Sequence, residues 1–161
     1  PMGDKAYKFP FTVTLSSAKP VTATLRVDGV ISTVKFEKAS EAATEYTATL
    51  PFNLSNGEDY TIGDIPYDVT YTVSENGETN GELTVGSGDN AVKYDVEYSN
   101  NNGTKVEGAT ATVTVTNTAG AGNVVIDTGV ILDNAPYIAM LAIVAIGGVA
   151  LMLNKRRRDE E

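Results

Sequence analysis

The 161-residue sequence contains no cysteine, no histidine and no tryptophan. Without cysteine, the chain cannot be stabilised by disulfides, and it offers no thiol as a nucleophile or metal ligand. Without histidine, the commonest general base and the commonest metal ligand are also missing. We therefore expect no metal site, no cofactor and no enzyme, and a carboxylate-based active site is the only enzymatic alternative left open.

Positive charge is scarce as well. The chain has 12 Lys and Arg residues against 21 Asp and Glu residues, a formal net charge of −9. A surface with this balance is unsuited to nucleic acid or to an anionic membrane face. Threonine, valine, glycine and asparagine are common instead, a composition typical of extracellular β-domains.

Helical periodicity is lacking before the C-terminal segment, and apolar residues alternate with polar ones. Turn dipeptides such as Asp28-Gly29, Asn56-Gly57, Asn76-Gly77 and Asn102-Gly103 separate the alternating runs. The predicted strands lie at residues 9–15, 21–27, 30–36, 46–50, 60–62, 69–73, 83–85, 92–98 and 109–118. This spacing predicts one all-β domain, an antiparallel sandwich over residues 1–118, followed by a flexible linker at 119–124.

Three signals follow the linker in a fixed order within residues 125–161. A short motif, Val125-Ile126-Asp127-Thr128-Gly129, precedes an uncharged run at about 135–153 and a basic cluster at 155–158. The run is just long enough to cross the hydrocarbon core as a helix, and the cluster favours a cytoplasmic C-terminus. The alternative is a core helix of a soluble domain, which is disfavoured because no other helical segment is expected to surround it.

The order of motif, apolar run and basic tail resembles the cell-wall sorting signal of Gram-positive surface proteins. The resemblance implies that a sortase cuts between Thr128 and Gly129 and joins Thr128 to an amine of peptidoglycan precursor or another pilin subunit. The family pattern is Leu-Pro-any-Thr-Gly, and here Val125 and Ile126 stand in place of Leu and Pro. The implied product is cell-wall anchored at the cell surface, and its precursor is inserted in the membrane.

Two polar residues have the parity of core positions. Glu75 continues the inward positions of the strand at 69–73, and Asn117 continues those of the strand at 109–118. Because strand side chains alternate between faces, this parity aims both side chains towards the interior. Glu and Asn at strand ends commonly turn out to water, however, and parity alone favours that interpretation for both residues.

The chain also resembles the C-terminal domain of streptococcal-type major pilins, in the Cna B-type isopeptide group. The matching stretches are GDKAYKFPFTVTL at 3–15, NGEDYTIGDIPYDVTYTVSEN at 56–76, TVTVTN at 112–117, and TGV with APYIA within 128–139. The resemblance implies an Ig-like sandwich with an autocatalytic amide between a Lys amine and an Asn side chain. Asn117 matches that acceptor, and Glu75 matches the carboxyl group that promotes the reaction.

The reacting lysine is not at its family position, which precedes the Gly-Asp pair found here at Gly3-Asp4. We therefore expect the first strand and its lysine to be absent, leaving an uncovered edge beside residues 109–118 that invites strand pairing. Lys8 has outward parity. Lys5 has inward parity but lies in a loop, and it is the remaining candidate for the amine.

These observations predict a structural cell-surface protein, the C-terminal portion of a sortase-processed pilin subunit or wall-anchored stalk. The expected partners are a sortase, other pilin subunits or peptidoglycan precursor, and the membrane before processing, but no nucleic acid. One alternative is an adhesin module that binds a host protein or glycan through its end loops. Another is a plain single-pass membrane protein in which Thr128-Gly129 is accidental.

Overall fold

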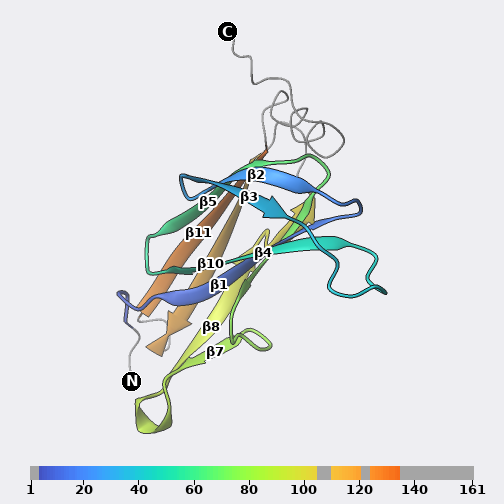
Figure 1. Ribbon diagram of the computed structural model, residues 1–161. Coiled ribbons are helices and arrows are strands. Elements are labelled where there is room, and N and C mark those ends of the chain that lie inside the picture. Colours follow the sequence, from blue (N-terminus) through green and yellow to red (C-terminus); the bar gives the residue numbers. More distant parts are fainter. Residues whose placement is uncertain (1–3, 105–109, 121–123, 135–161) are drawn as a thin grey trace.

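A computed structural model of the protein describes residues 4–104, 110–120 and 124–134. These residues form two β-sheets that pack face to face (Figure 1), so the predicted all-β sandwich is confirmed. The strands are β1 (Phe9–Ser17), β2 (Thr22–Val27), β3 (Val30–Lys35), β4 (Tyr46–Leu54), β5 (Asp59–Ile65), β6 (Thr70–Glu75), β7 (Glu82–Val85), β8 (Val92–Ser99), β9 (Asn102–Thr104), β10 (Thr110–Ala119) and β11 (Val124–Asn134).

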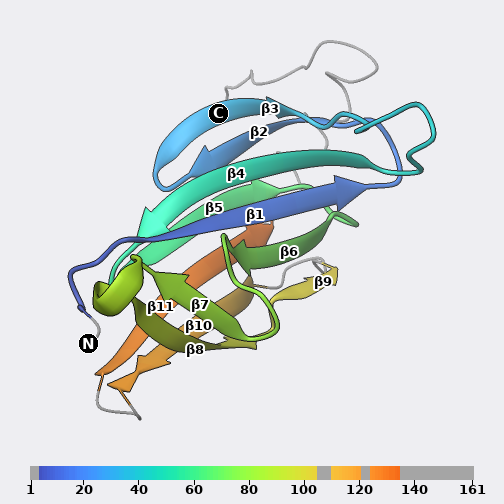
Figure 2. The same cartoon turned by 90° about the horizontal axis from the view of Figure 1, so that it is seen from below.

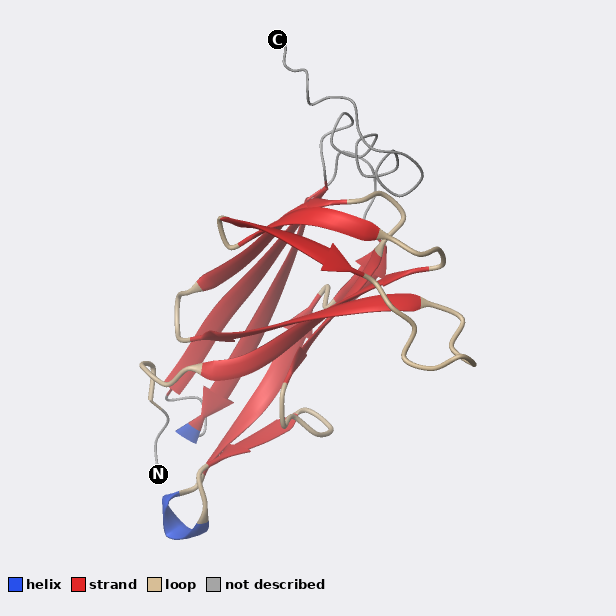
Figure 3. Ribbon diagram, viewed as in Figure 1, coloured by secondary structure: helices blue, strands red, loops and turns tan. Residues whose placement is uncertain are grey.

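The two sheets differ in size. The smaller has the order β4-β1-β6-β9, and the larger has the order β3-β2-β5-β11-β10-β8-β7. Figure 2 shows β4, β1 and β6 lying across the strands of the larger sheet. Strands and loops make up nearly all of the described chain (Figure 3), with a short 3₁₀ turn at Gly88–Asn90.

No helix within the described residues is long and apolar enough to span a membrane. The run at 135–153 and the basic cluster at 155–158, for which a spanning helix and cytoplasmic tail are expected, lie outside those residues.

The core lies between the sheets and follows the predicted alternation. On β1, the side chains of Phe9, Phe11, Val13 and Leu15 are fully buried. The residues between them are half-buried, as expected for a strand with one face towards the core. The period-two pattern therefore predicted this strand and its inward face correctly.

Of the four predicted turn dipeptides, Asp28-Gly29, Asn56-Gly57 and Asn76-Gly77 are turns and Asn102-Gly103 is not. Asp28 and Gly29 take φ angles of 48° and 87°, which suit the tight hairpin between β2 and β3. Asn102-Gly103, predicted as a turn, instead lies in β9 and pairs with β6. Gly103 packs closely against Tyr71, because a Cβ atom there would lie 3.2 Å from the tyrosine hydroxyl oxygen and the ring would have to shift.

The strand β11 changes the predicted domain boundary. It lies between β5 and β10, antiparallel to β10 and parallel to β5, so the sandwich is not wholly antiparallel. The sandwich extends past residue 118, because β10 ends at Ala119 and β11 begins at Val124. Both ends of the predicted 119–124 linker are therefore in strands.

The uncovered edge expected beside residues 109–118 is not present. Within the described chain, β10 is flanked by β8 and β11, and the ends of the larger sheet are β3 and β7. The physical reason is the alternation along β11, where one set of side chains is buried in the core. These are Val124, Ile126, Thr128, Val130 and Leu132.

Candidate functional site

Two polar side chains from opposite sheets meet in the core. Glu75 is the last residue of β6, and Asn117 lies near the end of β10. The Asn117 side-chain nitrogen Nδ2 donates a hydrogen bond to Glu75 Oε1 at 2.7 Å. Glu75 is 2% exposed and Asn117 is 1% exposed, so neither side chain turns out to water. The pair therefore bridges the two layers of the sandwich.

Each member of the pair keeps one oxygen without a hydrogen bond. Glu75 Oε2 and Asn117 Oδ1 are buried and have no partner within the described residues. A buried polar atom left unpaired costs about 1–3 kcal/mol, so such atoms are uncommon in folded proteins. Two unpaired acceptor oxygens, one on each member of a hydrogen-bonded pair, are suited to receive a hydrogen-bond donor such as an amine.

The surroundings of Glu75 favour its neutral form. Burial raises the pKa of this carboxyl group from 4.5 to about 7; the Asn117 hydrogen bond opposes the shift and the Glu78 charge adds to it. The Tyr98 hydroxyl accepts a hydrogen bond from the Glu75 backbone N–H at 2.9 Å and donates one to Glu78 Oε1 at 3.2 Å. Burial therefore favours the protonated form of Glu75 well above the pH at which an exposed carboxyl group loses its proton.

This arrangement can activate a carboxamide. The two ends of an Asn side chain are interchangeable by a 180° rotation, which would bring Asn117 Oδ1 to the Glu75 carboxyl group. A protonated Glu75 could then donate to that oxygen and make the carboxamide carbon more electrophilic. A neutral amine placed beside it would attack this carbon and release ammonia.

The walls of the site are apolar. Asn117 is paired in register with Val96 on β8 and with Ile126 on β11, and Glu75 is paired with Phe11 on β1. All three neighbours are buried. The medium around the pair is therefore poor at stabilising charge, which agrees with the raised pKa of Glu75.

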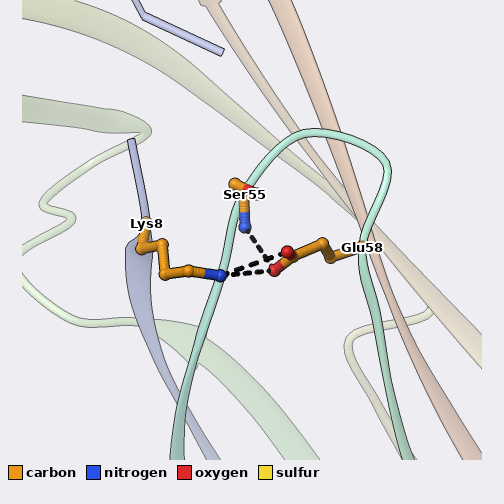
Figure 4. A network of polar contacts seen from close by, with 3 residues as sticks. All are labelled: Lys8, Ser55 and Glu58. Carbon is orange, nitrogen blue, oxygen red and sulfur yellow. Dashed lines mark hydrogen bonds and ion pairs between the residues drawn. The ribbon is translucent and has the colours of Figure 1, made fainter. Parts of the chain in front are cut away.

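The lysines considered as the amine lie elsewhere. Lys8 forms an exposed ion pair with Glu58 at 2.9 Å, and the Ser55 backbone N–H also donates to Glu58 Oε1 (Figure 4). Lys5 is exposed in the segment before β1. Neither lysine bonds to the pair, because Glu75 Oε2 and Asn117 Oδ1 have no partner.

The Thr-Gly motif lies inside the larger sheet. Thr128 is 4% exposed, and its hydroxyl group donates a hydrogen bond to the Val115 carbonyl oxygen at 3.3 Å. The Gly129 N–H donates to the Glu58 carbonyl oxygen at 3.2 Å on the other side. The Thr128–Gly129 peptide bond is thus enclosed between β10 and β5.

Glycine at position 129 has a steric role. A Cβ atom there would lie 2.6 Å from Asp59 Oδ1, too close for a contact without movement. The other motif side chains alternate, with Val125 and Asp127 facing outwards and Ile126 fully buried.

Ile126, predicted as part of the sortase motif, lies opposite Asn117, a place that the motif alone does not indicate. The alternation along 124–132 was the signal that could have revealed it. No cluster of acidic residues that could hold a metal ion occurs in 4–104, 110–120 and 124–134.

A family model described as "Domain of unknown function (DUF7601)" matches residues 1–119. No curated protein and no solved structure matches the chain. The matched region ends at the last residue of β10, so β11 lies outside it.

Proposed function

The chain belongs to the DUF7601 family, and we propose that it is a structural protein of the Gram-positive cell surface. In this proposal it is the C-terminal portion of a sortase-processed pilin subunit or wall-anchored stalk. The observation that carries the proposal is the order of Thr128-Gly129, the uncharged run at 135–153 and the basic cluster at 155–158. The precursor would span the membrane through that run before a sortase transfers Thr128 to an amine.

The buried pair supports the same proposal. A carboxyl group with a raised pKa, hydrogen-bonded to a carboxamide in an apolar core, is suited to form one amide bond without turnover of a separate substrate. Such a bond would join two strands of an Ig-like, Cna B-type sandwich covalently. It would supply the cross-link that a chain without cysteine cannot obtain from disulfides.

The position of the motif sets a condition on processing. A protease-like enzyme must reach both faces of an extended peptide bond, but Thr128–Gly129 has a strand on each side. In this proposal β11 therefore leaves the sheet before the sortase acts. The partners would be the sortase and then either peptidoglycan precursor or another pilin subunit.

When the chain is exported from a sortase-containing Gram-positive host, we expect it in the wall fraction, ending at Thr128. Thr128→Ala should shift most of the protein to the membrane fraction. The sortase must recognise threonine at this position before it can form its covalent bond to the carbonyl carbon of that residue. Cell fractionation followed by mass spectrometry of the released C-terminal peptide measures both effects.

Thr118→Ala is the matched control, since Thr118 lies on the neighbouring strand β10 and outside the motif. It should leave wall attachment unchanged. Equal wall attachment of the Thr128→Ala protein and the unmodified chain would reject the sortase proposal and favour a plain membrane anchor.

A further inference from the structure

β11 is an imperfect occupant of the position between β5 and β10, which we call the strand slot. Its buried side chain beside Asn117 is Ile126, which has no hydrogen-bond donor to offer. Glu75 Oε2 and Asn117 Oδ1 are left unpaired as a result. A strand with a hydrogen-bond donor at the register of Ile126 would bring that donor to the face of the sheet on which Asn117 lies.

β11 also differs from its two neighbours in lying outside the region that the family model matches. The family model covers the chain through residue 119 and so includes β5 and β10, but not β11. The family domain thus supplies both sides of the strand slot, and a segment beyond it supplies the strand inside. That segment contains the Thr128–Gly129 bond, whose backbone is paired on both sides.

We propose that the strand slot is an exchange site, in which an extended segment carrying lysine at the register of Ile126 replaces β11 and exposes the Thr128–Gly129 bond. The proposal rests on the amide chemistry of Glu75 and Asn117 described above. Cross-linking and release of the motif are then one event, since a single slot cannot hold both strands.

The unpaired atoms indicate which donor fits. A primary amine has enough N–H donors for two acceptor oxygens. Burial favours its neutral form, whose lone pair can attack the carboxamide carbon. A guanidinium group carries five N–H donors and stays charged, and two oxygens would leave most of its donors unpaired. A lysine side chain therefore matches the strand slot best, on an extended segment in which apolar residues alternate with polar ones.

The covalent step makes the exchange irreversible. The lysine Nζ forms a bond to the carboxamide carbon of Asn117, and the bond from that carbon to Nδ2 breaks. Glu75 passes a proton from the attacking amine to the departing nitrogen, which leaves as ammonia, so no oxidant or other reactant is needed. β11 cannot return once this amide has formed.

The test adds N-acetylated synthetic peptides of residues 124–134 to the full chain in mild detergent. One peptide carries Ile126→Lys, a second carries Val130→Lys, and a third is unchanged; without lysine substitution the peptide has no amine. Val130 is buried like Ile126 but is paired with Val113, away from Glu75 and Asn117. Peptide at about 1 mM or more is needed, because a tethered strand competes at an effective concentration on the order of millimolar.

We expect an adduct with the Ile126→Lys peptide alone, its mass being the sum of both parts less one ammonia. The adduct should be absent with Asn117→Ala or Glu75→Ala chains. In the adduct, the amides of residues 124–134 of the chain should exchange with deuterium at least tenfold faster, while those of β5 and β10 stay protected.

Equal adducts with both lysine peptides would overturn the proposal, because the reaction would not depend on register. No adduct would also overturn it if the Ile126→Lys chain itself loses ammonia, since the pair would then react without strand exchange. Neither outcome affects the wall-attachment experiment, which tests the proposed function separately.

Discussion

The Ile126→Lys variant of the full chain should lose one ammonia on folding, a decrease of about 17 Da from the stoichiometry of amine attack on a carboxamide. Ile126 is directly opposite Asn117 on the neighbouring strand and is fully buried. Side chains at such positions lie on the same face with Cβ atoms about 5 Å apart, within reach of a lysine. Intact-mass measurement should show the loss, and a cross-linked peptide joining β10 to β11 should locate it.

The same substitution should be strongly destabilising when the reaction is blocked. In the Glu75→Gln background the lysine stays buried in an apolar site with no carboxyl group to promote its reaction. Lowering the pKa of a buried amine by three units corresponds to a penalty on the order of 4 kcal/mol. The double variant should therefore unfold at much lower urea concentration than the reacted Ile126→Lys chain.

Val130→Lys is the control for this prediction. It places a lysine at a buried position of the same strand, but opposite Val113. It should be destabilised without any loss of mass. An unchanged mass in Ile126→Lys, with the chain folded, would show that Glu75 and Asn117 do not form an amide-forming pair.

The stability of the unmodified chain should decrease as the pH rises from 5 to 8. Glu75 has its pKa raised from 4.5 to about 7 by burial in the fold. A raised carboxyl pKa means that the folded state disfavours the charged form. Its stabilising contribution is thus complete below pH 4.5 and is lost as the pH passes about 7. The full shift of about 2.5 units corresponds to about 3.5 kcal/mol at roughly 1.4 kcal/mol per unit, and about 2–3 kcal/mol of this should be lost between pH 5 and 8 because the decrease begins near pH 4.5.

Urea unfolding at several pH values measures this change, because the free energy of unfolding varies linearly with denaturant. The chain has no histidine and no cysteine, so the side chains that ordinarily titrate in this range are missing. Glu75→Gln should remove most of the pH dependence, whereas Glu82→Gln, an exposed position, should keep it. A slope that is the same in both variants would contradict the role assigned to Glu75.

The inward parity of the pair could be recognised in the sequence because strand geometry has a period of two, although parity alone favoured exposed strand ends and only the family resemblance pointed to burial. Glu75 follows Val73 by two positions and Asn117 follows Val115 by two, so the inward face of each strand extends to the polar residue. The contact between the two side chains could not be predicted in this way. It depends on how two separate sheets are stacked, which no local pattern contains.

The place of β11 was missed for a different reason. Its alternation from Val124 to Leu132 has the pattern of a strand, but Thr128-Gly129 within it was interpreted as part of a processing signal. A segment can have both properties, and local sequence does not say which neighbours a strand will pair with. The parallel pairing with β5 is long-range information of this kind.

The enclosed position of β11 also has a mechanical consequence. The strand runs between β5 and β10 (Figure 1), so tension entering the chain at Asn134 pulls along its axis. The hydrogen bonds between β10 and β11 lie across that axis. They extend from the pair formed by Ala119 and Val124 to the pair formed by Thr110 and Asp133, and they would be loaded together in shear. A pull along the strand axis does not unzip the strand, because it does not break these hydrogen bonds one after another. Before any processing, the folded sandwich therefore resists force applied through the chain that follows Asn134, and it does so before any covalent bond has formed.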